Sequence, residues 1–190
     1  MKKNLFYTLR LSGILLAICA CVSAALAGVN AITEDRIAAI QQEKTQAAIA
    51  QVLEGEAEQM ELPEDLDLGI VRNAYVSECG FAVEVAPNGF DGEILMMVGV
   101  DLDGKVTGIS IISQTETAGL GAEAAADNAK GNAFREQYVG LSSEEILLSK
   151  DGGTLDALTG ATISSRAVTQ GVQAAVDFVV KNSIGEVGGK

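Results

Sequence analysis

The stretch DALTGATISSRAVTQGVQAAVDFVV (residues 156–180) joins a loop of small residues directly to an apolar repeat. From residue 163 to 180 the apolar positions recur at intervals of three and four, which is the spacing of one helix face. That face consists of Val168, Val172, Ala175, Val176 and Val179. We therefore predict a helix over 163–180 that packs its apolar face on the core of a domain.

The loop in front of this helix has the composition of an anion site. Gly160 and Ala161 leave the backbone unshielded, so a bulky group can approach, and Thr162 places a hydroxyl at the first turn. Free N–H groups at a helix start, together with the helix dipole, suit a phosphate. The N–H groups expected to be free are those of Ile163, Ser164 and Ser165. The alternative is that Thr162 is only an N-cap.

Short strand-like runs separated by turn signals precede the loop. Residues 81–85 end at Pro87-Asn88-Gly89, and residues 93–100 and 105–113 flank a second turn and predict a β-hairpin. A helix is expected over 122–138, and Ser142 with Glu145 forms a capping box that opens a short helix ending at Leu148. Strands followed by helices without regular alternation indicate an α+β fold, here a small antiparallel sheet packed by helices.

The N-terminal segment is long and apolar enough to be a membrane anchor. Residues 11–33 form a run of 23 without a charged side chain, and a helix needs about 20 residues to cross a bilayer. Basic residues Lys2, Lys3 and Arg10 precede the run, whereas Glu34 and Asp35 follow it. By the positive-inside rule, residues 1–10 stay in the cytoplasm, 11–32 cross the cell membrane once, and the remainder is extracytoplasmic.

Two alternatives involve cleavage of this segment. Ala25-Leu26-Ala27 matches the small-x-small pattern of a signal peptide, and Ala20-Cys21 hints at a lipoprotein site. Both alternatives also place the soluble part outside the cytoplasm. Beyond the anchor, residues 33–60 predict a helix that leads into an acidic loop around Pro63. We assign 33–70 to a helical and acidic linker and 71–185 to the extracytoplasmic domain.

The composition excludes several classes of function. The chain has 190 residues and no His, which removes His-based nucleophile pairs and His-based metal sites. From Thr33 onward there are 10 basic and 26 acidic residues, so the domain repels nucleic acid and we expect no binding to DNA or RNA. Cys19, Cys21 and Cys79 form no disulfide framework. We predict no metal site and no catalytic residue in this chain.

The string Asp-x-x-Thr-Gly-Ala-Thr at 156–162, followed by Ile-Ser-Ser-x-Ala-Val, resembles the flavinylation motif of FMN-binding domains. It is most similar to that of the G subunit of Rnf-type ion-translocating electron transport complexes, a relative of the C subunit of the sodium-translocating NADH:quinone reductase. The resemblance implies that a flavin transferase takes FMN from FAD and joins its phosphate to the last Thr, here Thr162. Asp156, Gly160 and Ala161 would serve transferase recognition and loop geometry.

A second segment, TETAGLG at 115–121, is similar to the Glu-Thr-Pro-Gly-Leu-Gly segment that lies against the flavin in this family. Ala118 replaces the usual Pro, so we expect a less rigid loop. The backbone of 119–121 would pack on the isoalloxazine ring and present N–H and C=O groups to its polar edge. The predicted cofactor site comprises Glu116, Thr117, Gly119, Leu120, Gly121, Asp156, Thr159, Gly160, Ala161, Thr162, Ile163, Ser164 and Ser165.

The resemblance implies a membrane-bound electron-transfer protein with FMN on Thr162, in a complex that couples electron transfer between ferredoxin and NAD to ion translocation. Its partners would be the other membrane subunits and, for maturation, a flavin transferase. One alternative keeps the flavin but changes the assembly, to a component like the C subunit of a sodium-translocating quinone reductase or to an extracellular electron-transfer flavoprotein. An alternative of a different class is a cofactor-free anchored binding module.

Overall fold

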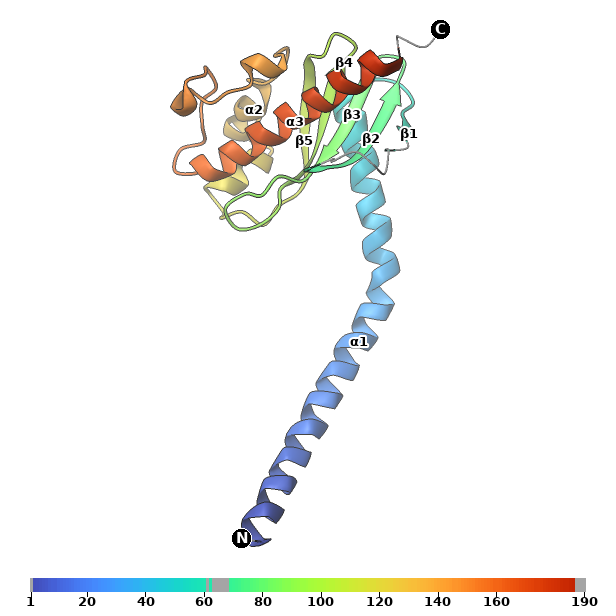
Figure 1. Cartoon of the computed structure of the whole chain (residues 1–190), viewed down its shortest axis with the longest axis vertical. Helices are drawn as coiled ribbons and strands as arrows, with labels where there is room; N and C mark the ends of the chain where they lie inside the picture. Colours follow the sequence, from blue (N-terminus) through green and yellow to red (C-terminus); the bar gives the residue numbers. More distant parts are fainter. Residues whose placement is uncertain (1, 61, 63–68, 187–190) are drawn as a thin grey trace. The chain divides into compact units, whose positions relative to one another are not determined.

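The computed structural model describes residues 2–60, 62 and 69–186 and divides into two compact units, Met1–Glu43 and Lys44–Lys190 (Figure 1). Helix α1 (Lys2–Val52) supplies all of the described part of the first unit. Within it, the span Arg10–Glu34 contains an 18-residue stretch with a mean hydropathy of 2.2, and no part of that stretch is buried. By length and composition this segment can cross a membrane, a test that a signal sequence also passes.

The second unit contains one antiparallel sheet whose strands lie in chain order. The strands are β1 (Glu58–Met60), β2 (Val71–Ser77), β3 (Gly80–Val85), β4 (Leu95–Asp101) and β5 (Val106–Ser113). The predicted hairpin is confirmed as β4 and β5, in which Val98 lies opposite Ile109. Strands β1 and β2 were not predicted, because β2 alternates apolar side chains with Arg72, Asn73 and Ser77 only irregularly.

Helices cover both faces of this sheet, which explains why its strands do not alternate cleanly between apolar and polar residues. On one face, α3 (Thr162–Glu186) packs the predicted apolar stripe, including Val168 and Val172, on β3, β4 and β5. On the other face, the last turns of α1 bury apolar side chains against Ala82 and Met97. The side chains contributed by the end of α1 and the residue after it are Ala48, Val52 and Leu53.

The compact unit in the structure has other bounds than the predicted linker over 33–70 and domain over 71–185. The compact domain begins at Lys44 rather than at residue 71, because the end of α1 forms part of the core. Helix α1 ends at Val52 instead of residue 60, and Gly55 follows with a φ of 93°, a conformation that glycine adopts without strain. Part of the predicted acidic loop, at residues 61 and 63–68, lies outside the described residues.

The segment between β5 and α3 is mostly made of short helical turns. These are η1 (Gly121–Ala125), α2 (Ala129–Glu136), η2 (Ser143–Glu145) and η3 (Ser149–Asp151). The single helix predicted over 122–138 is wrong, because the side chain of Asn128 caps α2 by accepting from two backbone N–H groups. The helix predicted from Ser142 to Leu148 is a single turn, in which the Glu145 carboxylate accepts from the Ser142 N–H and hydroxyl.

A buried hydrogen bond joins this segment to α3. Tyr138 is completely buried, packs edge-on against Phe134, and shares a hydrogen bond of 2.9 Å with the Thr169 hydroxyl. Burial raises the pKa of Tyr138 to about 12. The phenol therefore stays protonated at neutral pH, and it joins the segment before α3 to the second turn of α3.

The substitution Tyr138→Phe should lower the free energy of unfolding by about 1 kcal/mol, because it removes a buried hydrogen bond without changing the packed ring. Urea unfolding of the full chain in detergent would measure the change. Tyr75→Phe is the matched control, since no hydrogen bond joins the Tyr75 hydroxyl to another described residue. Equal midpoints for the two variants would contradict the assigned role of Tyr138.

Candidate cofactor site

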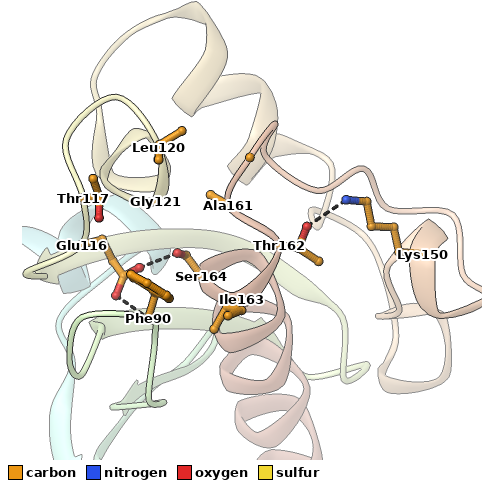
Figure 2. Close-up of a pocket in the computed structure, with 11 residues that line it drawn as sticks. Phe90, Glu116, Thr117, Leu120, Gly121, Lys150, Ala161, Thr162, Ile163 and Ser164 are labelled. Carbon is orange, nitrogen blue, oxygen red and sulfur yellow. Dashed lines mark hydrogen bonds between the residues drawn. The ribbon is translucent and has the colours of Figure 1, made fainter.

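A surface pocket of about 360 Å³ lies at the N-terminal end of α3, a volume within the range of roughly 300–1,000 Å³ seen for small-molecule and cofactor sites. Four segments that are distant in the sequence meet around it (Figure 2). The lining residues are Phe90, Glu116, Thr117, Leu120, Gly121, Lys150, Gly160, Ala161, Thr162, Ile163 and Ser164. Nine of the predicted site residues are brought together here.

Helix α3 begins at Thr162 itself. The Ala161 carbonyl accepts the first helical hydrogen bond, at 2.9 Å from the Ser165 N–H, so Ala161 occupies the cap position and Thr162 is the first helical residue. The alternative in which Thr162 is the N-cap is therefore wrong. The N–H groups of Thr162, Ile163 and Ser164 are hydrogen-bonded to no other described residue. The predicted set of free N–H groups is thus displaced by one residue, because Ser165 is bonded.

Ser165 holds the loop rather than lining the pocket. Its completely buried hydroxyl donates to the Ala161 carbonyl and accepts from the Leu158 N–H, both at 2.9 Å. Gly160 turns the chain between these two contacts with a φ of 76°, in the left-handed region that favours glycine. The side chain of Leu120 lies directly above it. These contacts fix the direction in which Thr162 leaves the loop.

Glu116 joins three of the four segments through its carboxylate. One oxygen, Oε1, accepts from the backbone N–H groups of Phe90 and Asp91, at 2.9 and 3.0 Å. The other, Oε2, accepts from the hydroxyl of Ser164 (Figure 2). Only 7% of Glu116 is exposed. Since both oxygens are already engaged with the protein, Glu116 shapes the pocket by holding its walls together.

Gly121 is required by this carboxylate. A Cβ atom at residue 121 would lie 2.3 Å from Ser164 Oγ and 2.6 Å from Glu116 Oε2, and neither atom can move without breaking their hydrogen bond. Gly89 is similarly constrained, because a Cβ there would lie 2.3 Å from Glu116 Oε1. The glycines of both loops therefore make room for one buried side chain.

Two lining residues were missed from the sequence. Phe90 follows the Pro-Asn-Gly turn and is 66% exposed. Lys150 lies in η3, and its Nζ atom donates to Thr162 Oγ1 at 2.8 Å (Figure 2). The signal for Phe90 was a large apolar residue in a turn, where it is unusual. No spacing pattern pointed to Lys150, because only the folded loop brings it to Thr162.

The loop that carries Lys150 is attached to α3 by an ion pair. Asp151 Oδ1 and Oδ2 accept from two nitrogens of Arg166, at 2.6 and 2.8 Å. These hydrogen bonds lower the pKa of Asp151 and raise the pKa of Arg166. The pair is therefore intact at neutral pH, and it is lost only as the pH falls through the lowered pKa of Asp151.

Four predicted site residues, Ser165 among them, do not line the pocket. Gly119 and Thr159 are exposed beside it. Asp156 is exposed too, and its backbone is held by the Gln137 side chain, which accepts from the Asp156 N–H at 2.8 Å and donates to its carbonyl at 2.9 Å. Asp156 is therefore a solvent-exposed residue in the loop that leads to Thr162.

Comparison of this chain with known proteins shows the family to which it belongs. Residues 89–177 match the family model of the FMN-binding domain, and residues 1–52 match that of the RnfG N-terminal region. The chain is 33% identical to the G subunit of an ion-translocating oxidoreductase complex from Aliivibrio fischeri, over 90% of both chains. It belongs to the G subunit family of ion-translocating oxidoreductase complexes.

Two further proteins are similar to this chain, a second G subunit and a C subunit of another complex. The chain is 36% identical to the G subunit of the Na(+)-translocating ferredoxin:NAD(+) oxidoreductase complex of Acetobacterium woodii, over 62% of this chain and 57% of that one. A crystal structure of the C subunit of the Na(+)-translocating NADH-quinone reductase from Parabacteroides distasonis aligns with 72% of this chain and 83% of that chain, at 18% identity and a TM-score of 0.45. The resemblance to the G subunit stated from the sequence is confirmed.

We expect Gly121→Ala to lower the free energy of unfolding by about 1–3 kcal/mol, because the new methyl group must displace either Ser164 or Glu116. Thermal or urea unfolding of the full chain in detergent would report the loss. Gly108→Ala is the control, since a Cβ at residue 108 would meet its nearest neighbours at an ordinary 3.6 Å. If the Gly121→Ala protein were as stable as the Gly108→Ala protein, the hydrogen-bonded pair of Glu116 and Ser164 would tolerate the extra volume, contrary to this prediction.

Proposed function

We propose that this protein is a membrane-anchored electron-transfer subunit that carries FMN esterified through its phosphate to Thr162. The observation that carries the proposal is the setting of the Thr162 hydroxyl. It lines a pocket beside three backbone N–H groups without a partner among the described residues and receives a hydrogen bond from Lys150. Such a helix start suits a phosphate, and a hydroxyl at that point can be esterified to it.

The rest of the pocket fits the remainder of FMN. Its exposed lining surface is more apolar than polar, and it includes the side chains of Phe90, Leu120 and Ile163, which suit a flat aromatic ring. The Gly121 backbone approaches the pocket without a side chain in the way. The match of residues 89–177 to the FMN-binding domain supports the same cofactor.

The cofactor would supply the redox chemistry, because it accepts electrons and passes them on. The chain's own residues would bind the cofactor and orient it. The helix start and Lys150 would hold the phosphate, and the loop of Glu116 would support the ring through its fixed backbone. A covalent tether has a clear use outside the cytoplasm, since a lost flavin could not be replaced there.

The proposal includes partners and a location. Two of the G subunits that resemble this chain are named as parts of ferredoxin:NAD(+) oxidoreductase complexes, which supports a place among other membrane subunits. A flavin transferase would attach the FMN and could recognise the exposed Asp156. The basic residues before the apolar segment and the acidic residues after it support an extracytoplasmic domain held by a single anchor.

Thr162→Ala should abolish covalent flavin in protein co-expressed with its flavin transferase, because the alanine offers no oxygen for the phosphoester. In-gel flavin fluorescence after denaturing electrophoresis and intact mass would measure the attachment. Thr162→Ser is the matched control and should keep both signals, since it retains the hydroxyl.

Fluorescence that persists in Thr162→Ala would place the attachment at another residue. A wild-type protein without added FMN mass, even with the transferase present, would favour the cofactor-free binding module instead.

A further inference from the structure

We propose that Lys150 is the phosphate-binding cation of the attachment site, an inference that rests on the proposed function. Its Nζ atom lies 2.8 Å from Thr162 Oγ1 and donates a hydrogen bond to it. This oxygen is the atom that would bridge the threonine and the phosphorus in the phosphoester. Figure 2 shows the lysine side chain reaching from its own loop toward this atom.

The loop of Lys150 is held in place by neighbouring contacts, which keeps Lys150 close to Thr162. The neighbouring Asp151 grips Arg166 with both carboxylate oxygens, and the Ser149 N–H donates to the Leu155 carbonyl at 2.7 Å. Arg166 lies one helical turn after Thr162, so two consecutive residues of the loop bind two successive turns of α3. The backbone of Lys150 is therefore fixed before a phosphate binds, and only its side chain has conformational entropy left to lose.

The charge of Lys150 is available for an anion. The salt bridges among the described residues join Arg72 to Glu93 and Arg166 to Asp151, and neither includes Lys150. The charge of Arg166 is balanced by Asp151, whereas the ammonium group of Lys150 faces a neutral hydroxyl. In a chain with a formal net charge of -13, this places an ammonium group that no salt bridge among the described residues engages beside Thr162, where a phosphodiester would place one negative charge.

The same cation would assist the attachment step. Thr162 Oγ1 attacks the FMN phosphorus of FAD, and a P–O bond to the threonine forms as the P–O bond of the pyrophosphate breaks. AMP leaves with the electron pair of that bond, the hydroxyl proton passes to a base of the transferase, and the flavin is neither oxidised nor reduced. Lys150 stabilises the negative charge on the transferred phosphoryl oxygens and then remains as the counter-ion of the diester.

The test follows attachment to full-length apoprotein in detergent, mixed with flavin transferase and FAD, by intact mass over time. Lys150→Met, which removes the charge, should slow attachment by about tenfold or more. Lys150→Arg keeps the charge and should recover most of the rate. Lys130→Met is the matched control, because Lys130 is an exposed lysine on α2 outside the pocket, and it should react at the wild-type rate.

Two further readouts separate phosphate binding from a structural role. The apo form of Lys150→Met should unfold at the wild-type temperature, because its side chain is exposed. The phosphorus-31 resonance of the attached diester should shift in Lys150→Met relative to the wild type, and Lys150→Arg should restore it at least in part. If Lys150→Met fails to fold, Lys150→Gln against Lys150→Arg tests the same difference in charge.

Attachment to Lys150→Met at the wild-type rate with an unchanged phosphorus resonance would overturn the inference and leave the Thr162 linkage standing. Absence of FMN from the wild-type protein, or its presence on Thr162→Ala, would overturn the proposed function and this inference together.

Discussion

The buried carboxylate of Glu116 is the contact on which the pocket depends. It ties the turn after β3, the loop after β5 and the first turn of α3 to one another, through hydrogen bonds to Phe90, Asp91 and Ser164. A carboxylate in this position is stable only because each oxygen has a donor. Three of the four segments around the pocket are therefore held together by one side chain, and the absence of side chains at Gly89 and Gly121 follows from its presence.

Thr162 gains its distinctive position from being the first helical residue instead of the cap. A capping threonine would use its hydroxyl to satisfy one of the free N–H groups of the helix. Here the loop is closed by Ser165 through the Ala161 carbonyl, so the hydroxyl of Thr162 is left to face the pocket and Lys150. Ser165 therefore has a structural role in the loop, whereas Thr162 lines the pocket.

The sequence allowed the α+β class, the hairpin of β4 and β5, and the apolar stripe of α3 to be predicted, because each follows from a local periodicity. It did not reveal β1 and β2, since β2 is irregular and β1 has only three residues. Asn128 interrupts a segment that its apolar content made look continuous. The candidate site divides in the same manner. The residues close to Thr162 were found because they belong to one sequence motif with a fixed spacing. The contact of Lys150 with Thr162 has no such signal in the sequence. It depends on how a loop twelve residues earlier folds back and is held by the ion pair of Asp151 and Arg166.

The packing of α1 under the sheet decides where a soluble fragment of this protein can start. A fragment that begins at residue 71, where the sequence suggests a boundary, would lack Val52 and Leu53. Ala82 and Met97 would then be exposed to water as part of an apolar sheet face. This fragment would also lose the strand that protects the edge of β2. A fragment that begins at Lys44 keeps both, and omits the segment that would require detergent.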